Sequence, residues 1–373
     1  MTAPVTASRA VPRRLRVLLV GKAAPDRGGI PTFLEMLRGG ALADTHEVTL
    51  LNVAHAGVPE GGRLTAGNLR RTFGDALAVW RRAADHDVVH IHSALAPSVT
   101  VLRAALLAWA ARARGSAVVV HAHGGNIATW LGGRVNRVLM RAAMLPAHRV
   151  VAVWTAGEQA LRTVLPAGKV CLVDNGVPLG DLPQRDAARR PPRILYVGLL
   201  TPRKGVLDLA AASVILRERG VDHELHLLGG TPDEGPDAEA AVRDGLPSWT
   251  RLLGTRDPAD MAAAYAEAEV FCLPSWWEAM PLSVLEAMAS GLPVVASDVG
   301  DIGRAVQDGA TGFVVPSQDP ERLADALEKL LADPDTRAAM GAASRARVEA
   351  HFSAEVTARG IDGLYQQVDA GRR

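Results

Sequence analysis

The chain has 373 residues, of which 48% are hydrophobic and 22% charged, a composition typical of packed globular proteins and not of disordered ones. It contains no apolar run near the roughly 18 residues that span a bilayer, no apolar core of a secretory signal at its N-terminus, and two cysteines, too few for a disulfide framework. The charges balance overall but not locally, since residues 1–190 hold 24 Lys and Arg against 12 Asp and Glu, whereas residues 191–373 hold 17 against 28. We therefore expect a cytoplasmic protein of about two domains with different partners.

The expected strands form two series, because short apolar runs alternate with longer amphipathic stretches. In the first series, strands are expected at 16–20, 46–51, 88–92, 117–121, 149–153 and 170–173, with helices at 31–38, 68–84, 98–114 and 133–145. In the second, strands are expected at 193–197, 223–228, 250–253, 270–273, 293–296 and 312–315, with helices at 207–219, 258–267, 283–290 and 320–331. The strands lack polar alternation, so each series predicts an α/β domain with a doubly wound parallel sheet.

A polar segment with two prolines, 184–193, separates the two series and coincides with the change in charge. We therefore predict a first domain over 1–183, a linker over 184–192 and a second domain over 193–351. The stretch 353–368 has helical spacing and follows no strand, so 352–373 is expected to form a separate C-terminal helix.

Two carboxylates lie eight positions apart after the expected strand at 270–273. Glu278 precedes Pro281 and so lies in a loop, whereas Glu286 lies about one turn into the next helix. The unpaired N–H groups at the start of such a helix favour phosphate, and the carboxylates can accept hydrogen bonds from sugar or ribose hydroxyls. The alternative is a solvated glutamate on a surface helix.

A basic pair, Arg203 and Lys204, lies in the loop between Gly198 and Gly205, directly after an expected strand. A lysine point charge and an arginine fork both suit a diphosphate. The alternative is a solvated basic turn, and the loop lacks the glycine and lysine spacing of a P-loop.

The glycine pair Gly28 and Gly29 follows the first expected strand. Glycines allow the backbone to approach a ligand closely, and Pro31 suits the first turn of the helix that follows. The loop lacks the Gly-x-Gly-x-x-Gly fingerprint of nicotinamide-binding proteins.

Four histidines lie at the ends of two expected strands, His90 and His92 on one and His121 and His123 on the other. We favour a neutral imidazole that donates a hydrogen bond to a substrate oxygen. A zinc site is the alternative, although no cysteine and no carboxylate except Asp87 lies nearby in the sequence.

Two Asp-x-Asp patterns, at 85–87 and 333–335, have the form of a metal-binding pair. Because Asp87 directly precedes an apolar run, we expect it to mark the entry to a strand. The second pair follows a helix and is expected to form a turn and cap.

Together these motifs resemble the family 4 retaining glycosyltransferases of the GT-B fold, over nearly the whole chain. Glu278 and Glu286 match the family's Glu-x7-Glu motif. Further matches are the sequence Asn175-Gly176-Val177 and the segments 280–291, 293–297 and 308–316. The resemblance implies two Rossmann-like domains that face a cleft, with a C-terminal helix that returns to the first domain.

The resemblance also implies roles for individual residues. Glu286 should hydrogen-bond the nucleotide ribose, and Glu278 should hold sugar hydroxyls near the transferring carbon. His123 should contact the donor sugar near the reaction centre.

The implied diphosphate site combines charge with backbone N–H groups. Lys204 should neutralise the leaving diphosphate, and Gly29 should approach it from the first domain. The backbone groups expected to meet the diphosphate and sugar belong to Met280, Leu282 and Ser283. Many family members carry an arginine where this chain has Leu199, and Arg203 is expected to supply that charge.

The resemblance implies an enzyme that moves a sugar from a UDP- or GDP-sugar to an acceptor hydroxyl with retention, without a metal or other cofactor. The preferred context is bacterial surface polysaccharide or glycolipid assembly. The alternatives are a non-catalytic GT-B partner subunit and another GT-B enzyme, such as a nucleotide-sugar epimerase or a phosphorylase. Ala279 and Asp301 replace glycines common in the family, which leaves the sugar and base open.

The basic first half is expected to face the glycan or lipid-linked acceptor. Arg134, Arg137 and Arg141 share one face of an expected helix, beside apolar residues. Such a face fits an anionic membrane surface and peripheral attachment to its inner side, whereas the alternative is ordinary solvated arginine. No nucleic-acid partner is expected.

Overall fold

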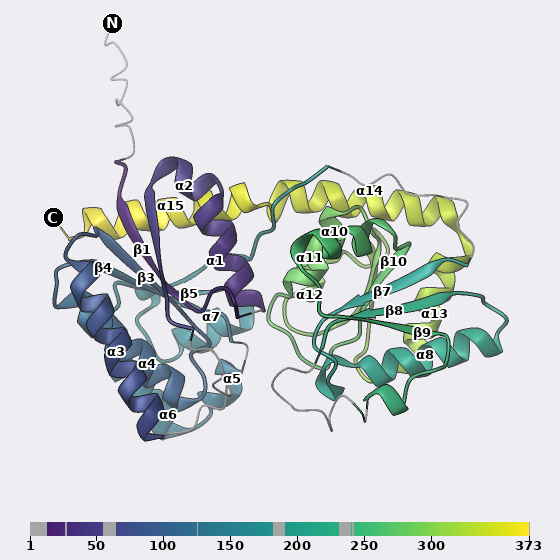
Figure 1. The fold of residues 1–373 in the computed structure, drawn as a ribbon, viewed down its shortest axis with the longest axis horizontal. Helices are drawn as coiled ribbons and strands as arrows, with labels where there is room; N and C mark the ends of the chain where they lie inside the picture. The colour runs from purple at the N-terminus through teal and green to yellow at the C-terminus, as the bar shows by residue number, and fades with distance from the viewer. Residues whose placement is uncertain are drawn as a thin grey trace, which may run out of the picture.

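The computed structural model describes residues 13–26, 28–54, 65–124, 126–181, 191–230, 240 and 242–372. These residues form two α/β domains, each built on one parallel sheet of six strands. The domains lie side by side, and two long C-terminal helices run along one edge of the pair (Figure 1). The doubly wound fold class expected from the sequence is confirmed. Most of the expected linker, 184–190, lies outside the described residues.

The first sheet has the strand order β2-β1-β3-β4-β5-β6. Its strands are β1 (Arg16–Gly21), β2 (Glu47–Asn52), β3 (Val88–Ser93), β4 (Ala117–Ala122), β5 (Arg149–Ala152) and β6 (Val170–Leu172). The helices are α1 (Gly29–Gly39), α2 (Ala41–Thr45), α3 (Ala66–Ala83), α4 (Ser98–Arg112), α5 (Ile127–Trp130), α6 (Arg134–Ala143) and α7 (Thr155–Arg162), with a short 3-10 helix at Ala167–Lys169.

The second sheet has the order β12-β11-β10-β7-β8-β9. Its strands are β7 (Arg193–Val197), β8 (Glu224–Leu228), β9 (Thr250–Gly254), β10 (Val270–Leu273), β11 (Val294–Ser297) and β12 (Gly312–Val315). The helices are α8 (Val206–Glu218), α10 (Pro258–Ala266), α11 (Leu282–Ala289), α12 (Ile302–Ala305), α13 (Pro320–Ala332) and α14 (Pro334–His351), with a 3-10 turn at Pro202–Lys204.

Both faces of the first sheet are buried. Along β1, Leu18 and Val20 pack in a core formed with α3, α4 and α6, whereas Val17 and Leu19 pack in a second core formed with α1 and α15 (Ala354–Ala370). This alternation follows from the two-residue period of a strand. It also explains why the strands are almost continuously apolar in sequence.

The C-terminal helices join the two domains. Helix α14 packs on α11 of the second domain, and α15 buries Ile361, Leu364 and Tyr365 against the first. Ser353 begins α15, because its side chain accepts a hydrogen bond from the Val356 N–H. The returning helix expected from the sequence is therefore confirmed.

The two chain crossings between the domains lie against each other. Val177 forms a parallel bridge with Ser353, and its N–H donates to the Phe352 carbonyl at 3.0 Å. Both Val177 and Phe352 pack in the core of the second domain. The crossings thus form a narrow two-stranded connection.

Both expectations for the Asp-x-Asp pairs are confirmed. Asp87 is buried at the entry to β3, where its carboxylate accepts from the Arg16 N–H at 2.9 Å and pairs with Arg13. Asp333 caps α14 by accepting from the N–H groups of Asp335 and Thr336. Hydrogen bonds and ion pairs within the fold therefore account for both aspartates.

Candidate functional site

Each sheet has one point where the chain reverses its direction of strand addition. In the second sheet this point lies between β7 and β10, and in the first between β1 and β3. Ligands of doubly wound sheets bind where loops leave the carboxyl ends of strands at such points. The loops after β7 and β10 carry Lys204 and Glu278, and the loop after β1 ends at Gly28, directly before α1 begins at Gly29.

Lys204 and Glu278 meet at the centre of the second domain's loops. Lys204 Nζ lies 2.5 Å from Glu278 Oε1, and the Ser275 hydroxyl donates to the same oxygen at 2.8 Å. The side chain of Glu278 is 8% exposed and that of Lys204 16% exposed. A nearly buried carboxylate is thus held by one charge and one hydroxyl, with its second oxygen left for other partners.

The loop after β7 is fixed against the loop after β10. Gly205 has φ 69°, and a Cβ there would lie 1.9 Å from the Pro274 carbonyl oxygen, so glycine is required on both counts. The Trp276 N–H donates to the Arg203 carbonyl at 2.9 Å. The guanidinium of Arg203 is directed to the Trp277 ring, 5.7 Å from its centroid.

Glu286 lies in α11 and is held by a residue from α10. The Tyr265 hydroxyl donates to Glu286 Oε2 at 2.8 Å. Burial raises the pKa of Glu286, and the hydrogen bond from Tyr265 opposes this shift. No side chain caps the start of α11 at Leu282 and Ser283, so their N–H groups face the loop region unpaired by a cap.

The first domain presents His123 directly after β4. Its Nε2 lies 2.9 Å from His92 Nδ1, and burial lowers the pKa of His123 to about 3, which keeps the ring neutral. The next position, Gly124, requires glycine, because a Cβ there would lie 2.4 Å from the Ala94 carbonyl oxygen. Helix α1, which follows β1 in the chain, starts at Gly29 without a side-chain cap. A Cβ on Gly29 would meet open space.

The four histidines form one cluster of stacked and tilted rings on β3, on β4 and directly after β4. The rings of His90, His92, His121 and His123 lie 4.2–5.2 Å from their neighbours in the stack. Both nitrogens of His121 and the Nε2 atoms of His90 and His92 have no hydrogen-bond partner. Within the described part of the chain, these three residues form the group that could hold a metal ion, with ligand atoms within 4.8 Å of one another.

Two family models match the two domains in turn. The first, described as Glycosyltransferase Family 4, matches residues 27–181, and the second, Glycosyl transferases group 1, matches residues 191–333. The chain belongs to the family 4 glycosyltransferases. The expectation from the motifs is confirmed, and the matches together span both sets of loops that form the candidate site.

Curated relatives of the chain include the D-inositol 3-phosphate glycosyltransferase of Corynebacterium efficiens, 37% identical over 47% of this chain and 42% of the relative. The alpha-D-kanosaminyltransferase of Streptomyces kanamyceticus is 28% identical over 64% of this chain and 59% of the relative. The matched segment thus spans less than two thirds of each relative's length.

Solved structures confirm the GT-B fold. A sucrose-phosphate synthase from Thermosynechococcus elongatus matches with a TM-score of 0.73 and 24% identity, covering 95% of this chain and all of that one. Anabaena HepE, solved with UDP and glucose, matches with a TM-score of 0.73 and 17% identity over 94% and 99% of the chains. At these identities the likeness concerns the fold.

The candidate site contains contacts that the sequence did not indicate. Tyr265 and Ser275 hold the two motif glutamates, but neither belongs to a recognisable spacing. Asn175, from the Asn-Gly-Val segment, donates to the Met280 carbonyl at 2.8 Å and so ties the domain connection to the loop after β10. The contacts of Tyr265 and Asn175 join residues that are far apart in the sequence, so the sequence alone does not indicate them.

Asp301, noted above as a departure from the family, links the domains. Its carboxylate accepts from the Thr155 N–H at 2.7 Å and the Thr155 hydroxyl at 2.9 Å, at the start of α7. Arg304 also pairs with Asp301 at 2.8 Å. The carboxylate is therefore engaged in a contact between the domains.

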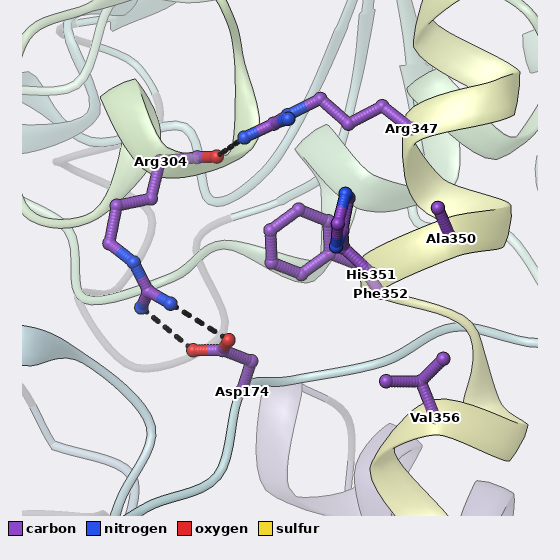
Figure 2. A pocket seen from close by; sticks show the side chains of 7 residues that line it. All are labelled: Asp174, Arg304, Arg347, Ala350, His351, Phe352 and Val356. Atoms are coloured by element: carbon purple, nitrogen blue, oxygen red, sulfur yellow. Dashed lines mark hydrogen bonds and ion pairs between the residues drawn. The ribbon is translucent and has the colours of Figure 1, made fainter.

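A pocket of about 430 Å³ lies beside the connection between the domains (Figure 2). Arg304 forms a two-pronged ion pair with Asp174 on one side, and Arg347 donates to the Arg304 carbonyl on another. Phe352 and Val356 line the wall formed by the C-terminal crossing. This pocket lies at the connection and contains none of the expected donor-site residues.

Proposed function

We propose that this protein transfers a sugar from a nucleoside diphosphate sugar to an acceptor hydroxyl, with retention of the anomeric configuration. The observation that carries the proposal is the contact of Lys204 with Glu278 at the switch point of the second sheet. It unites a cation for a diphosphate and a buried carboxylate for sugar hydroxyls in one place. Family membership and the GT-B fold support the same reading.

On the donor side, the leaving diphosphate gains negative charge as the sugar bond breaks. Lys204 and the uncapped start of α11, at Leu282 and Ser283, would stabilise that charge, as would Met280 through its N–H and Arg203 at the loop's outer side. The uncapped start of α1 at Gly29 would approach from the first domain. These groups are fixed before the donor arrives, so little reorganisation opposes the reaction.

On the sugar and ribose side, three residues have distinct tasks. Glu278 accepts hydrogen bonds from sugar hydroxyls, and Glu286 accepts them from the ribose diol. His123 is neutral at physiological pH because its pKa is about 3, so its free ring nitrogen can donate to a sugar hydroxyl near the reaction centre. The leaving phosphate serves as the proton acceptor for the attacking hydroxyl.

The acceptor is proposed to be a glycan or a lipid-linked molecule on the cytoplasmic side, bound by the first domain in surface polysaccharide or glycolipid assembly. One curated relative is named a D-inositol 3-phosphate glycosyltransferase and another is named for the transfer of kanosamine, so a small phosphorylated polyol is a second candidate for the acceptor and an amino sugar is a candidate for the transferred group. We propose that neither metal nor cofactor takes part in the transfer.

The first experiment is a thermal-shift screen of UDP, GDP and ADP and their sugars, because a ligand of the native state raises its apparent stability. Hydrolysis of the stabilising donor is then measured for the wild type with and without EDTA, with equal rates expected. A non-catalytic subunit would show no turnover, and an epimerase would convert the donor without releasing the nucleotide.

Two variants test the site itself. Glu278→Ala and Lys204→Ala should each lower the rate by about 100-fold, the scale of a lost transition-state contact. The control is Glu218→Ala, which removes an exposed carboxylate at the end of α8. Full activity of both site variants would refute the proposed site.

A further inference from the structure

Large apolar side chains are concentrated on one outer layer of the first domain. Among the described residues, most of the exposed large hydrophobic side chains belong to α3, α4 and α6 or directly follow α6. They are Leu69, Phe73, Leu77, Trp80, Leu102, Trp109, Val135, Val138 and Leu145. Phe73 is 57% exposed and Val135 79% exposed, so these side chains are far from any core. We call this the α3–α4–α6 surface.

The apolar side chains are ordered along each helix. On α3 they recur every three or four positions from Leu69 to Trp80, which makes a single stripe. On α4, Leu102 and Trp109 lie seven positions apart, on the side away from the buried Val101, Ala104 and Ala108. Two turns of helix separate them, so they point the same way.

The three helices lie beside one another at the outside of the domain (Figure 1). Helix α4 packs against both α3 and α6. Arg114, just after α4, places its guanidinium 4.5 Å from the centroid of the Trp80 ring of α3. This contact sets the apolar stripe of α3 next to α4, so the stripes belong to one continuous surface.

The charge of the α3–α4–α6 surface is one-sided. Eight exposed arginines lie on these helices or within two residues of their ends. They are Arg70, Arg81, Arg82, Arg112, Arg114, Arg134, Arg137 and Arg141. The single acidic residue within the three helices is Asp75, which is buried and paired with Arg103 at 2.7 Å; the exposed Asp85 lies beyond the end of α3.

A basic pocket of about 500 Å³ opens at the α6 end of this surface. Leu145 of the apolar set lines it, together with Arg141, Arg162 and Lys169. Arg141 donates to the Val164 carbonyl, and Lys169 Nζ donates to the Leu145 carbonyl at 3.2 Å, which fixes both chains at the rim. Cations beside an apolar surface are complementary to the interface of a bilayer, where phosphate headgroups meet acyl chains.

We propose that the α3–α4–α6 surface docks on an anionic lipid bilayer, with the apolar stripes among the acyl chains and the arginines among the headgroup phosphates. A second copy of the chain is a poorer occupant, because a two-fold contact would set arginines against arginines. Nucleic acid is poorer too, because six of the nine exposed apolar side chains are leucine or valine, which have no flat face on which bases could stack. The inference deepens the proposed function, since it places a lipid-linked acceptor where the first domain meets the membrane.

Co-flotation of the full chain with vesicles tests the proposal. The probes are phosphatidylcholine vesicles with and without about 30 mol% phosphatidylglycerol, at low salt and at about 0.5 M salt, where surface charge is strongly screened. We expect flotation with the anionic vesicles at low salt, at least fivefold less with neutral vesicles, and a clear loss at high salt. Equal flotation with both vesicle types, or none with either, would overturn the proposal.

Variants separate docking from folding and catalysis. The double variant Phe73→Ser, Trp109→Ser removes exposed apolar groups and should lower flotation at least fivefold. The matched control is Leu207→Ser, Val214→Ser, which removes exposed apolar groups from α8 of the second domain and should float like the wild type. Unchanged flotation of the first double variant contradicts the inference.

Further readouts separate the outcomes. Hydrolysis of a water-soluble donor should be unchanged in the double variant, because its positions lie outside the donor site. If the wild type floats but never turns over a donor, docking stands and the proposed function fails. Concentration-dependent dimers abolished by Phe73→Ser, Trp109→Ser would show that a second copy covers the surface and would overturn the membrane assignment, as would oligonucleotide binding lost in the same variant.

Discussion

In the histidine cluster, one buried residue orients another. His92 Nδ1 and His123 Nε2 lie 2.9 Å apart, and with both rings neutral one nitrogen must donate and the other accept. When His92 donates, the proton of His123 is placed on Nδ1, the nitrogen left for a substrate. His92 is thus a positioning residue for the proposed donor site.

Replacing His92 by Phe should lower kcat for donor turnover by about tenfold, about 1.4 kcal/mol, because His123 loses the partner that fixes its tautomer. The dissociation constant of the nucleotide should change little. His92→Asn retains an N–H near the position of Nδ1 and should recover much of the rate. Equal losses in both variants, in step with a loss of thermal stability, would indicate a packing role alone.

The same cluster predicts acid sensitivity. Burial lowers the pKa of His90 and His123 to about 3 and that of His92 and His121 well below the ordinary value. In the unfolded chain these rings titrate near 6.5. Their contribution to stability is therefore complete above about pH 6.5 and is lost as the pH falls toward the folded values, by about 1.4 kcal/mol per histidine and pH unit.

Urea unfolding at pH 7, 6 and 5 measures this effect. The free energy of unfolding should fall with decreasing pH. His121→Leu should reduce the slope of this free energy against pH by the equivalent of about one bound proton. Because neither nitrogen of His121 has a hydrogen-bond partner, the substitution breaks no hydrogen bond. A slope unaltered by this substitution would show that His121 is not a buried neutral base. Metal analysis of the purified protein adds an independent check, since bound metal would steepen the acid loss by release of the ion.

At the scale of elements, the loop after β7 depends on close backbone approach. Gly205→Ala should destabilise the fold by about 1–3 kcal/mol and weaken donor binding, because a left-handed φ and a contact with the Pro274 carbonyl must both be relieved. Thermal unfolding and nucleotide titration measure the two effects. Gly220→Ala is the matched control, since Gly220 also has a positive φ (79°) but meets nothing within 4 Å. Equal donor affinity in both variants would contradict a special role for the Gly205 approach.

The strands were predictable from sequence and several helices were not. All twelve strands lie within one residue of the expected ranges, because strands buried on both faces are continuous apolar runs. Helix α14 was not among the expected helices. Its sequence begins with Pro334 and consists largely of small residues and arginines, so it shows no clear apolar stripe. Helix α7 starts at Thr155, whose N–H is satisfied by Asp301, 146 positions away, so no local cap indicated it.

The candidate site was predictable to the same depth. The motif spacing predicted Glu278, Glu286 and Lys204 as site residues, and the structure places Glu278 and Lys204 in contact. Tyr265 is 21 positions from Glu286, and their hydrogen bond depends on the packing of α10 against α11. Such a partner leaves no periodic signal in a single sequence.

At the scale of the whole molecule, the two chain crossings and a few polar contacts set the angle between the domains. The chain crosses twice at one place, through Val177 and Ser353, so the connection resists sliding better than rotation. Rotation is opposed by the bonds from Thr155 to Asp301, by the ion pair of Arg304 with Asp174 and by the bond from Asn175 to the Met280 carbonyl. The last of these contacts touches the loop that carries Glu278, so domain closure and site geometry are coupled.

Asp301→Ala should therefore open the molecule. Loss of the hydrogen bonds to a charged acceptor is worth about 1.5–3 kcal/mol each when buried, enough to shift the closed population by tenfold or more. The radius of gyration from X-ray scattering should rise without ligand, and donor affinity should fall, because donor binding must then supply the closing energy. Asp298→Ala, an exposed carboxylate before α12, is the control. If saturating nucleotide returns the variant to the wild-type radius, the donor itself selects the closed form; an unchanged radius without ligand would mean that the two crossings alone fix the angle.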